Sequence, residues 1–291
     1  MKRYIGLAAL ALLVMGCEKE DNYQVEDGVM RIEVLHPSTT RATETAFESG
    51  DVIGLYATEY AGEVAAPLQI SGNWANNVAT TYNGLVWTPA KKIFWSENKM
   101  DVYGYYPYMA PSSIDEHLWS VQLDQSTPET TDALSGYEAS DFLWAKATDV
   151  EQANGDVQLQ FKHICSKLVI KLVRGEDFTD DIPDNTEVYL HSTVPTATID
   201  FTKGIISKDI YGTREKIKAR KIASDTFEVI LVPQSITERL PFVEIIMGDV
   251  AYMTEDMLSY RPSVQYSVEI TLNSSPDKIK VEIGGEVTDW E

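Results

Sequence analysis

The sequence predicts an all-β protein built from antiparallel β-sandwiches. Short alternating or continuous apolar runs recur at close spacing, and Gly, Pro, Asn, Ser and Asp separate them. Long stretches with a 3.6-residue apolar period, which would indicate helices, are absent. Many short strands with turns between them are typical of sandwiches. A hydrophobic content of 44%, with 10% aromatic residues, can build cores, so a globally disordered chain is excluded.

The expected strands run along the whole chain after its first residues. In chain order they are residues 29–35, 52–56, 85–87, 100–106, 118–123, 142–145, 157–172, 186–190, 197–201, 226–232, 242–247, 266–272 and 278–283. The polar stretch 148–156 separates two parts that hold similar numbers of strands, and 291 residues suffice for two domains. We therefore expect an N-terminal domain at residues 42–155 and a C-terminal domain at residues 156–291.

The expected strand at residues 157–172 changes its pattern midway. From Val157 to Phe161 the apolar residues share one parity, and from Ile164 to Leu172 they share the opposite parity. Because side chains on a strand alternate between two faces, such a change indicates a bulge or a passage from one packing environment to another. We expect the change at His163, where a long strand would enter the second domain.

Residues 1–16 have the features of a lipoprotein signal peptide. Lys2 and Arg3 precede a mostly apolar stretch at residues 4–16, which is too short for a bilayer span of about 20 residues but suits a signal sequence. The stretch ends in LVMGC, so Cys17 is the expected lipid attachment site. The alternative is an ordinary secretory signal with a cysteine nearby. If Cys17 carries lipid, Cys165 has no disulfide partner.

The charge balance limits the partners. The formal net charge is −21, which disfavours binding to nucleic acid and to anionic lipid headgroups. We therefore expect no nucleic-acid partner.

Catalytic and metal-binding motifs are missing, so we expect neither an enzyme nor a cofactor. The four histidines, His36, His117, His163 and His191, show no HExxH spacing, and no cysteine cluster, GxSxG elbow or Walker-type glycine loop occurs. Cys165 and His163 lie on one expected strand, where a packed thiol and a buried, hydrogen-bonded imidazole are favoured over a nucleophile and a base.

Two further segments each allow a structural and a functional interpretation. The acidic run at residues 176–187 could hold calcium, but it lacks the EF-hand pattern, so a solvated loop is favoured. The tyrosine-dense run at residues 102–108 could stack on sugar rings, although packing in a sandwich core is favoured.

The segment before Ala46 combines a strand with an exposed connector. Met30, Ile32 and Val34 lie on one face of the expected strand, as in a strand that covers a hydrophobic groove. The Thr-rich stretch that follows holds one basic residue, Arg41, and the next Lys or Arg is Lys91. Exposed polar connectors are the usual sites of proteolysis.

Four segments together resemble the fimbrillin-like (type V pilin) family of Bacteroidales. They are residues 40–56, 100–108, 159–172 and 229–236. The first contains the family's Phe-x-x-Gly-Asp-x-Ile-Gly pattern as Phe47, Gly50, Asp51, Ile53 and Gly54. Their order and spacing make the combination specific, and the resemblance covers essentially everything after the signal peptide.

The resemblance implies a fold and an assembly mechanism. It implies two transthyretin-like antiparallel β-sandwich domains in tandem, in a lipoprotein precursor that reaches the outer membrane and the cell surface. It implies that an Arg-specific protease cuts at Arg41–Ala42, which removes residues 17–41 with their first strand and opens a groove. A strand from another fimbrial subunit then fills the groove. Exposed strand edges suit such strand addition.

The C-terminal segment is a candidate donor strand. Ile279, Val281 and Ile283 alternate with charged residues. The alternative is a final strand of the chain's own second sandwich, and the sequence leaves both open. The resemblance links a donated tail to a stalk subunit, and the sequence does not assign a stalk, tip or anchor role.

The expected function is that of a fimbrial structural subunit or tip adhesin, with host or bacterial surface ligands as further partners. The alternative is a monomeric surface lipoprotein that binds glycan or a host ligand, with aromatic rings around Tyr103–Tyr108 as the binding surface.

Overall fold

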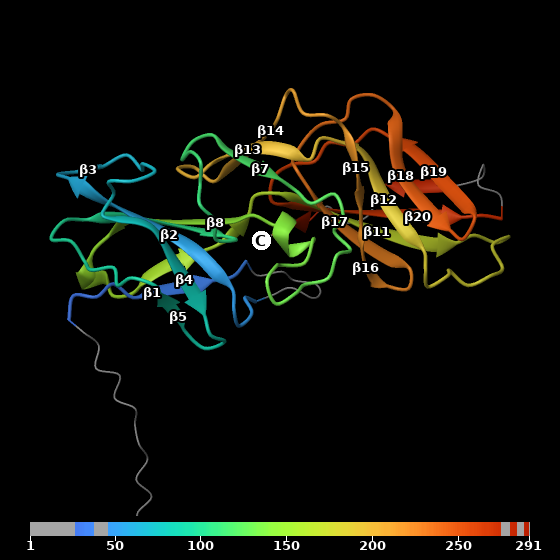
Figure 1. Cartoon of the computed structure of the whole chain (residues 1–291). Coiled ribbons are helices and arrows are strands. Elements are labelled where there is room, and N and C mark those ends of the chain that lie inside the picture. Colours follow the sequence, from blue (N-terminus) through green and yellow to red (C-terminus); the bar gives the residue numbers. More distant parts are fainter. Residues whose placement is uncertain (1–26, 38–45, 275–279, 284–287, 291) are drawn as a thin grey trace, which may run out of the picture.

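The protein is all-β in its described part, as the sequence predicts. The computed structural model describes residues 27–37, 46–274, 280–283 and 288–290, and this part contains strands and two short 3₁₀ turns but no α-helix. The turns are Glu138–Ser140 and Gln152–Asn154. Figure 1 shows most strands of the first half of the chain on the left and most strands of the second half on the right.

A seven-stranded antiparallel sheet forms the centre of the first half. Its order is β10-β8-β6-β2-β4-β5, with β3 beside β2. The strands are β2 (Val52–Ala61), β3 (Val64–Ala65), β4 (Ala75–Tyr82), β5 (Trp87–Pro89), β6 (Met100–Tyr106), β8 (Leu143–Val150) and β10 (Lys162–His163). The sequence predicts β6 with the same bounds, whereas it does not predict β4.

A two-stranded parallel sheet covers one face of this central sheet. It pairs β1 (Ile32–Leu35) with β9 (Val157–Gln160). Between the two sheets lies the smaller of two hydrophobic cores, which includes Ile53, Met100 and Val102 from the central sheet. The expectation of wholly antiparallel sheets is therefore wrong at this pair, because β1 runs alongside β9 in the same direction.

The opposite face of the central sheet is also buried. There Tyr105 of β6 packs edge-on against Phe201, at 4.8 Å between ring centroids, beneath the three-stranded sheet β14-β13-β7. Its strands are β7 (His117–Ser120), β13 (Thr196–Asp200) and β14 (Ile205–Lys208). Because both faces are covered, every residue of β6 is buried. β7 and β13 also join the two halves of the chain in one sheet.

Two further sheets enclose the larger core. One has the order β16-β17-β11-β20-β21, with β22 also beside β20, and the other has the order β15-β12-β18-β19. The first comprises β11 (Ser166–Arg174), β16 (Arg220–Ala223), β17 (Thr226–Leu231), β20 (Val264–Leu272), β21 (Lys280–Ile283) and β22 (Thr288–Asp289). The second comprises β12 (Glu187–Thr193), β15 (Glu215–Lys218), β18 (Leu240–Met247) and β19 (Val250–Asp256). The antiparallel expectation is wrong here too, because β11 and β20 pair in parallel.

The chain passes from the smaller core to the larger core at His163. Val157 and Phe161 belong to the smaller core, whereas Ile164 and Leu172 belong to the larger one. The change of parity in the sequence therefore marks a change of packing environment. The expected single strand at residues 157–172 is divided into β9, β10 and β11.

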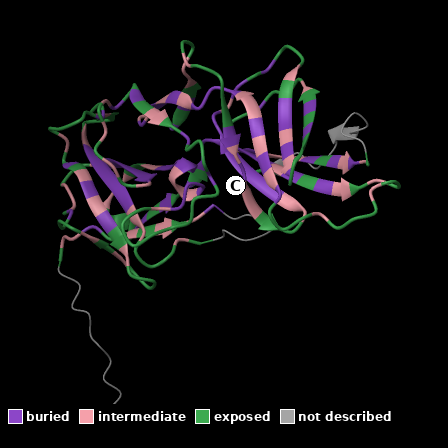
Figure 2. Ribbon diagram, turned by 45° about the vertical axis from the view of Figure 1, so that its right-hand side comes forward, coloured by how far each residue is buried: buried purple, intermediate pink, exposed green. Residues whose placement is uncertain are grey.

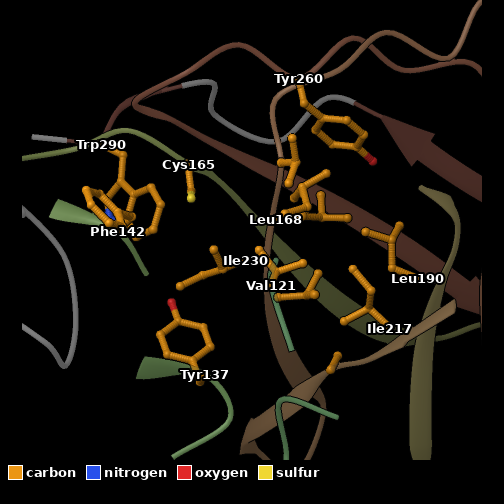
Figure 3. Packing of buried hydrophobic residues seen from close by; sticks show 14 of the residues in the cluster. Val121, Tyr137, Phe142, Cys165, Leu168, Leu190, Ile217, Ile230, Tyr260 and Trp290 are labelled. Carbon is orange, nitrogen blue, oxygen red and sulfur yellow. The ribbon is translucent and has the colours of Figure 1, made fainter. Parts of the chain in front are cut away.

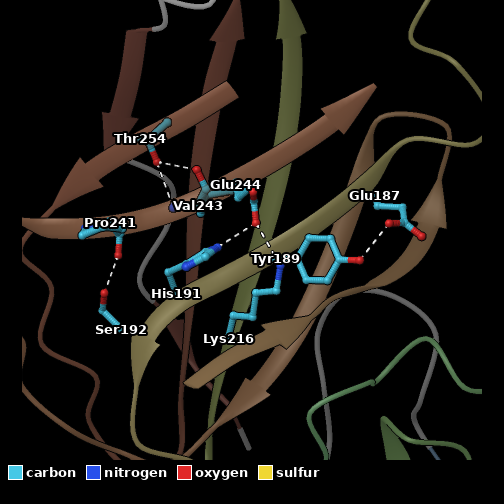
Figure 4. Close-up of polar contacts among 9 residues, drawn as sticks. All are labelled: Glu187, Tyr189, His191, Ser192, Lys216, Pro241, Val243, Glu244 and Thr254. Carbon is cyan, nitrogen blue, oxygen red and sulfur yellow. Dashed lines mark hydrogen bonds and ion pairs between the residues drawn. The ribbon is translucent and has the colours of Figure 1, made fainter. Parts of the chain in front are cut away.

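The outer face of sheet β15-β12-β18-β19 is polar. Figure 2 shows buried and exposed residues alternating along its strands. In Figure 4, His191 contacts Glu244 (Nε2 to Oε2, 2.9 Å), and this bond is the main cause that lowers the pKa of the Glu244 carboxyl. The Lys216 ammonium lies 4.4 Å from the centre of the Tyr189 ring. Such contacts stabilise a solvated sheet face.

Candidate functional site

The β1 strand covers the smaller core with its apolar face. Met30, just before β1, is 4% exposed, and Ile32 and Val34 pack against the same core. Glu33 and Leu35 face outward, as the alternation predicts. Burying these three apolar side chains contributes on the order of 5 kcal/mol to retaining the strand.

Backbone hydrogen bonds hold this segment along both edges. On one edge, the Val157 N–H donates to the Arg31 carbonyl (2.9 Å) and the Phe161 N–H donates to the Leu35 carbonyl (2.9 Å). On the other edge, the Met30 N–H donates to the Ile93 carbonyl (2.8 Å). The segment thus fills a slot between β9 and the stretch around Ile93.

Charged contacts contribute little to the retention of the β1 segment. The ion pair between Arg31 and Asp156 (2.7 Å) has side chains that are 59% and 37% exposed, so solvent screens it. Gln158 donates to Glu33 (2.5 Å) in a similarly exposed position. Apolar burial and backbone pairing are therefore the main forces on the segment.

Residues of the Phe-x-x-Gly-Asp-x-Ile-Gly pattern pack at the end of the slot that β1 fills. Phe47 packs edge-on against Phe161 and Tyr106, with ring centroids 5.6 Å apart in each case. The Asp51 carboxylate accepts hydrogen bonds from the Glu48 N–H (2.7 Å) and from the Tyr106 hydroxyl (3.0 Å). Each of these contacts fixes the turn that leads into β2.

The two glycines of the pattern, Gly50 and Gly54, are required for different structural reasons. Gly50 has φ +113°, a left-handed conformation that favours glycine. A Cβ on Gly54 would lie 2.2 Å from Cε1 of Tyr105, so only glycine allows the Tyr105 ring to lie across β2.

A pocket of about 560 Å³ opens at the end of the slot. His36, Phe47 and His163 line it. Carboxylates dominate its polar lining, namely Glu48, Asp51, Glu129, Asp132, Glu138 and Asp141. Burial raises the pKa of the Asp51 carboxyl and lowers the pKa of the His36 imidazole.

His163 links this pocket to the C-terminal end of the chain. Its Nδ1 lies 2.9 Å from the Asp141 carboxylate, and Trp290 stacks on its ring. The backbone N–H of Trp290 donates to the Ser263 carbonyl (2.8 Å), and the side chain is buried in the larger core. Figure 3 shows Trp290 beside Phe142 and close to Cys165.

Comparison with known proteins decides the family. The fimbrillin-like family model matches residues 40–290, which is most of the chain. The chain belongs to the fimbrillin-like family.

Solved structures share the fold of this fimbrillin-like chain. A crystal structure described as a cell adhesion protein from Bacteroides ovatus superposes with a TM-score of 0.68 at 21% identity, over 90% of this chain and 98% of that chain. A cell adhesion protein from Bacteroides uniformis gives a TM-score of 0.69 at 21% identity, over 92% of this chain and 100% of that chain. A search of curated proteins gives no match.

Several predicted site residues of the fimbrillin-like chain lie outside the described residues. They are Cys17, Arg41, Ala42 and Ile279. Met30, Ile32 and Val34 lie together over the smaller core. The backbone of Val281 and Ile283 pairs with β20 opposite Ile270 and Val268. In this state β21 is therefore an edge strand of the chain's own sheet.

Other sequence-based interpretations are settled by burial. His163 is buried and bonded to Asp141, and Cys165 is buried with the pKa of its thiol raised by burial, so both structural interpretations are confirmed. Tyr103, Tyr105 and Tyr106 are buried, so the core-packing interpretation is confirmed for these three rings, whereas Tyr108 at the end of the run is 42% exposed.

The roles of Trp290 and His36 are not evident from sequence, because neither stands in a motif. In the described part of the fimbrillin-like chain, no helix is long and apolar enough to cross a membrane. The same residues contain no group of three or more His, Cys, Asp or Glu arranged to hold a metal ion.

Proposed function

We propose that this chain is a subunit of a bacterial surface fimbria, as a structural subunit or a tip adhesin, and that it assembles by strand exchange. The observation that carries the proposal is the position of β1. Its apolar face covers a hydrophobic core, and its backbone pairs with β9, while its charged contacts are exposed and weak. Membership of the fimbrillin-like family supports a fimbrial role.

The proposed maturation follows from the sequence on both sides of β1. Cys17 would carry lipid and hold the precursor at the outer membrane, and an Arg-specific protease would cut at Arg41–Ala42. The described structure ends at Pro37 and resumes at Ala46, so β1 and the body of the chain flank the cleavage site. After cleavage, β1 would be held without a covalent bond.

Loss of β1 would create an acceptor groove. It would expose apolar residues such as Val157 and Leu159 beside backbone groups of β9 that β1 now pairs. An edge of this kind binds an added strand, with main-chain bonds giving affinity and alternate side chains giving register. Head-to-tail addition between identical subunits produces an open filament.

The C-terminal strand would be retained in the free subunit. β21 pairs with β20, and Trp290 is buried in the larger core. Donation of this strand to a neighbour would require that Trp290 leave its site, so the free subunit favours the role of acceptor.

The two cores support a division into two transthyretin-like sandwich domains. The smaller core lies in the first half, and most of the larger core lies in the second half. Sheet pairing continues to His163 in the first half, and β7 pairs with β13 across the division. Limited proteolysis that releases two folded fragments, one for each core, would support the division.

The experiment that tests the function is the Arg41→Ala substitution in the producing bacterium. We expect wild-type protein on intact cells to begin at Ala42 and to form filaments, and we expect Arg41→Ala to keep its lipidated N-terminus and to stay out of them. Arg31→Ala is the matched control, because Arg31 lies beside β1 and makes an exposed ion pair. Equal filament entry by Arg41→Ala and the wild type would refute the proposed cleavage.

A further inference from the structure

The buried imidazole of His163 has one unsatisfied nitrogen. The ring is 3% exposed, and its Nδ1 bonds to the Asp141 carboxylate at 2.9 Å. A carboxylate only accepts, so Nδ1 carries a hydrogen, and in the tautomer with its hydrogen on Nδ1 the Nε2 atom is an acceptor. Within the described part of the chain, this Nε2 has no hydrogen-bond partner. A buried polar atom without a partner is unfavourable.

His36, the residue directly after β1, does not donate a hydrogen bond to the Nε2 of His163. The His36 ring lies edge-on to the His163 ring, with centroids 6.1 Å apart. The Nδ1 of His36 bonds to the Pro37 carbonyl at 2.9 Å, so this nitrogen carries its hydrogen. Burial lowers the pKa of the His36 imidazole. A neutral His36 therefore has no second N–H to offer to His163.

The surroundings of both rings are acidic. The lining of the pocket that they share also includes six carboxylates, among them Asp51 and Asp141, whose charges act on His36. Nearly all of its polar groups accept hydrogen bonds, and the pocket is large enough for a guanidinium or an ammonium group. A side chain longer than histidine would carry its positive charge past the buried ring position and into this pocket.

We propose that His163 and the acidic pocket bind one side chain of the incoming strand, at the position that His36 now holds. They favour arginine or lysine at this position. This inference rests on the proposed strand exchange. The N–H groups of the cation supply the donor that His163 Nε2 lacks, and its charge lies among carboxylates. The resident segment then acts as an imperfect occupant, which a matched donor strand from another subunit displaces.

The test is a strand-exchange assay on the full chain. An engineered cleavage site within residues 38–45 is cut, and the resident segment is challenged with fluorescent peptides of the sequence of residues 28–37. The peptides carry His36, His36→Arg, His36→Leu or His36→Glu, and binding is followed by anisotropy. We expect the His36→Arg peptide to bind about tenfold more tightly than the His36→Leu peptide, as for one regained buried hydrogen bond.

A matched control separates this pocket from general attraction by an acidic protein. The Leu35→Arg peptide adds a positive charge one residue away, on the exposed side of the strand, and we expect it to bind like the unmodified peptide. On the protein, His163→Phe keeps a ring for Trp290 but removes the acceptor, so the preference for arginine should be lost. If His163→Phe does not fold, as judged by circular dichroism, the peptide series decides alone.

The outcomes are distinct. Equal binding of the His36→Arg and His36→Leu peptides, or tightest binding of the His36→Glu peptide, would overturn the assignment of His163 while leaving strand exchange intact. Failure of every peptide to displace the resident segment would overturn strand exchange itself, and this inference with it.

Discussion

Trp290 stacks face to face on His163, with ring centroids 3.7 Å apart and ring planes 9° apart. The same imidazole meets His36 edge-on, directly after β1. The segment that precedes the connector and the last described residues of the chain therefore contact one buried side chain. Changes at either end act on His163, which makes the packing of the two ends interdependent.

Replacing Trp290 tests how far this stack stabilises the fold. Trp290 is 4% exposed, so Trp290→Ala should lower the free energy of unfolding by about 3 kcal/mol, through lost burial and an unfilled cavity. Urea denaturation followed by circular dichroism measures the change. The control is Trp74→Ala, because Trp74 is 47% exposed and should cost less than about 1 kcal/mol. Equal losses in the two variants would contradict the role given to the stack.

Met30 should dominate the retention of the N-terminal segment once the connector is cut. Met30→Ala removes a buried side chain from the smaller core and should weaken retention by about 2 kcal/mol, or roughly thirtyfold in dissociation. Leu35→Ala is the control, because Leu35 is 37% exposed and outside that core. Size-exclusion chromatography of the cut protein over time gives both rates. Similar rates for the two variants would show that apolar burial does not hold the strand.

The strands with clear local patterns could be predicted from the sequence, whereas their partners could not. β6 has the predicted bounds because Met100–Tyr106 is mostly apolar and is buried on both faces. β4 is not predicted from the sequence because it contains Asn76 and Asn77, and asparagine is uncommon in strands. The parallel pairing of β11 with β20 leaves no local signal, since alternation defines the faces of a strand but not its neighbours.

The candidate site likewise has one part that the sequence predicts and one part that it does not. The apolar face of β1 follows from alternation alone, and Met30 does lie over a core. The pocket at its end depends on contacts between His36, His163 and Trp290, which lie far apart in the sequence. Only the return of β22 along β20, with Asp289 opposite Val264, brings Trp290 to His163.

Gly54→Ala should destabilise the protein through steric conflict. The new Cβ would lie 2.2 Å from Cε1 of Tyr105, a buried ring whose hydroxyl donates to the Met109 carbonyl at 2.7 Å. The ring cannot move without losing this bond, so we expect a loss of about 3 kcal/mol in the free energy of unfolding. Gly248→Ala has no atom within 4 Å and only the strain of φ +58°, so it should cost about 1 kcal/mol. Thermal or urea denaturation distinguishes the two values.

Retention of the cut N-terminal segment should weaken as the pH falls below about 6.5. Burial lowers the pKa of His36 from 6.5, so the released segment takes up a proton in a pH range where the bound segment does not. Proton uptake then favours release, and the contribution of His36 is lost as the pH falls from 6.5 towards its lowered pKa. The groups that face His36 are His163, Asp51 and Asp141. Because burial raises the pKa of Asp51, its protonation in acid acts in the opposite direction.

Dissociation rates of the cut segment at pH 7.5 and pH 5.5 test this sign, and two variants assign it. His36→Gln should remove most of the increase at pH 5.5, because it removes the group that takes up the proton. His117→Gln should leave the increase intact: burial lowers the pKa of His117 as well, but His117 lies on β7, away from the slot that β1 fills. An increase that persists in His36→Gln would show that His36 is not the source of the pH dependence.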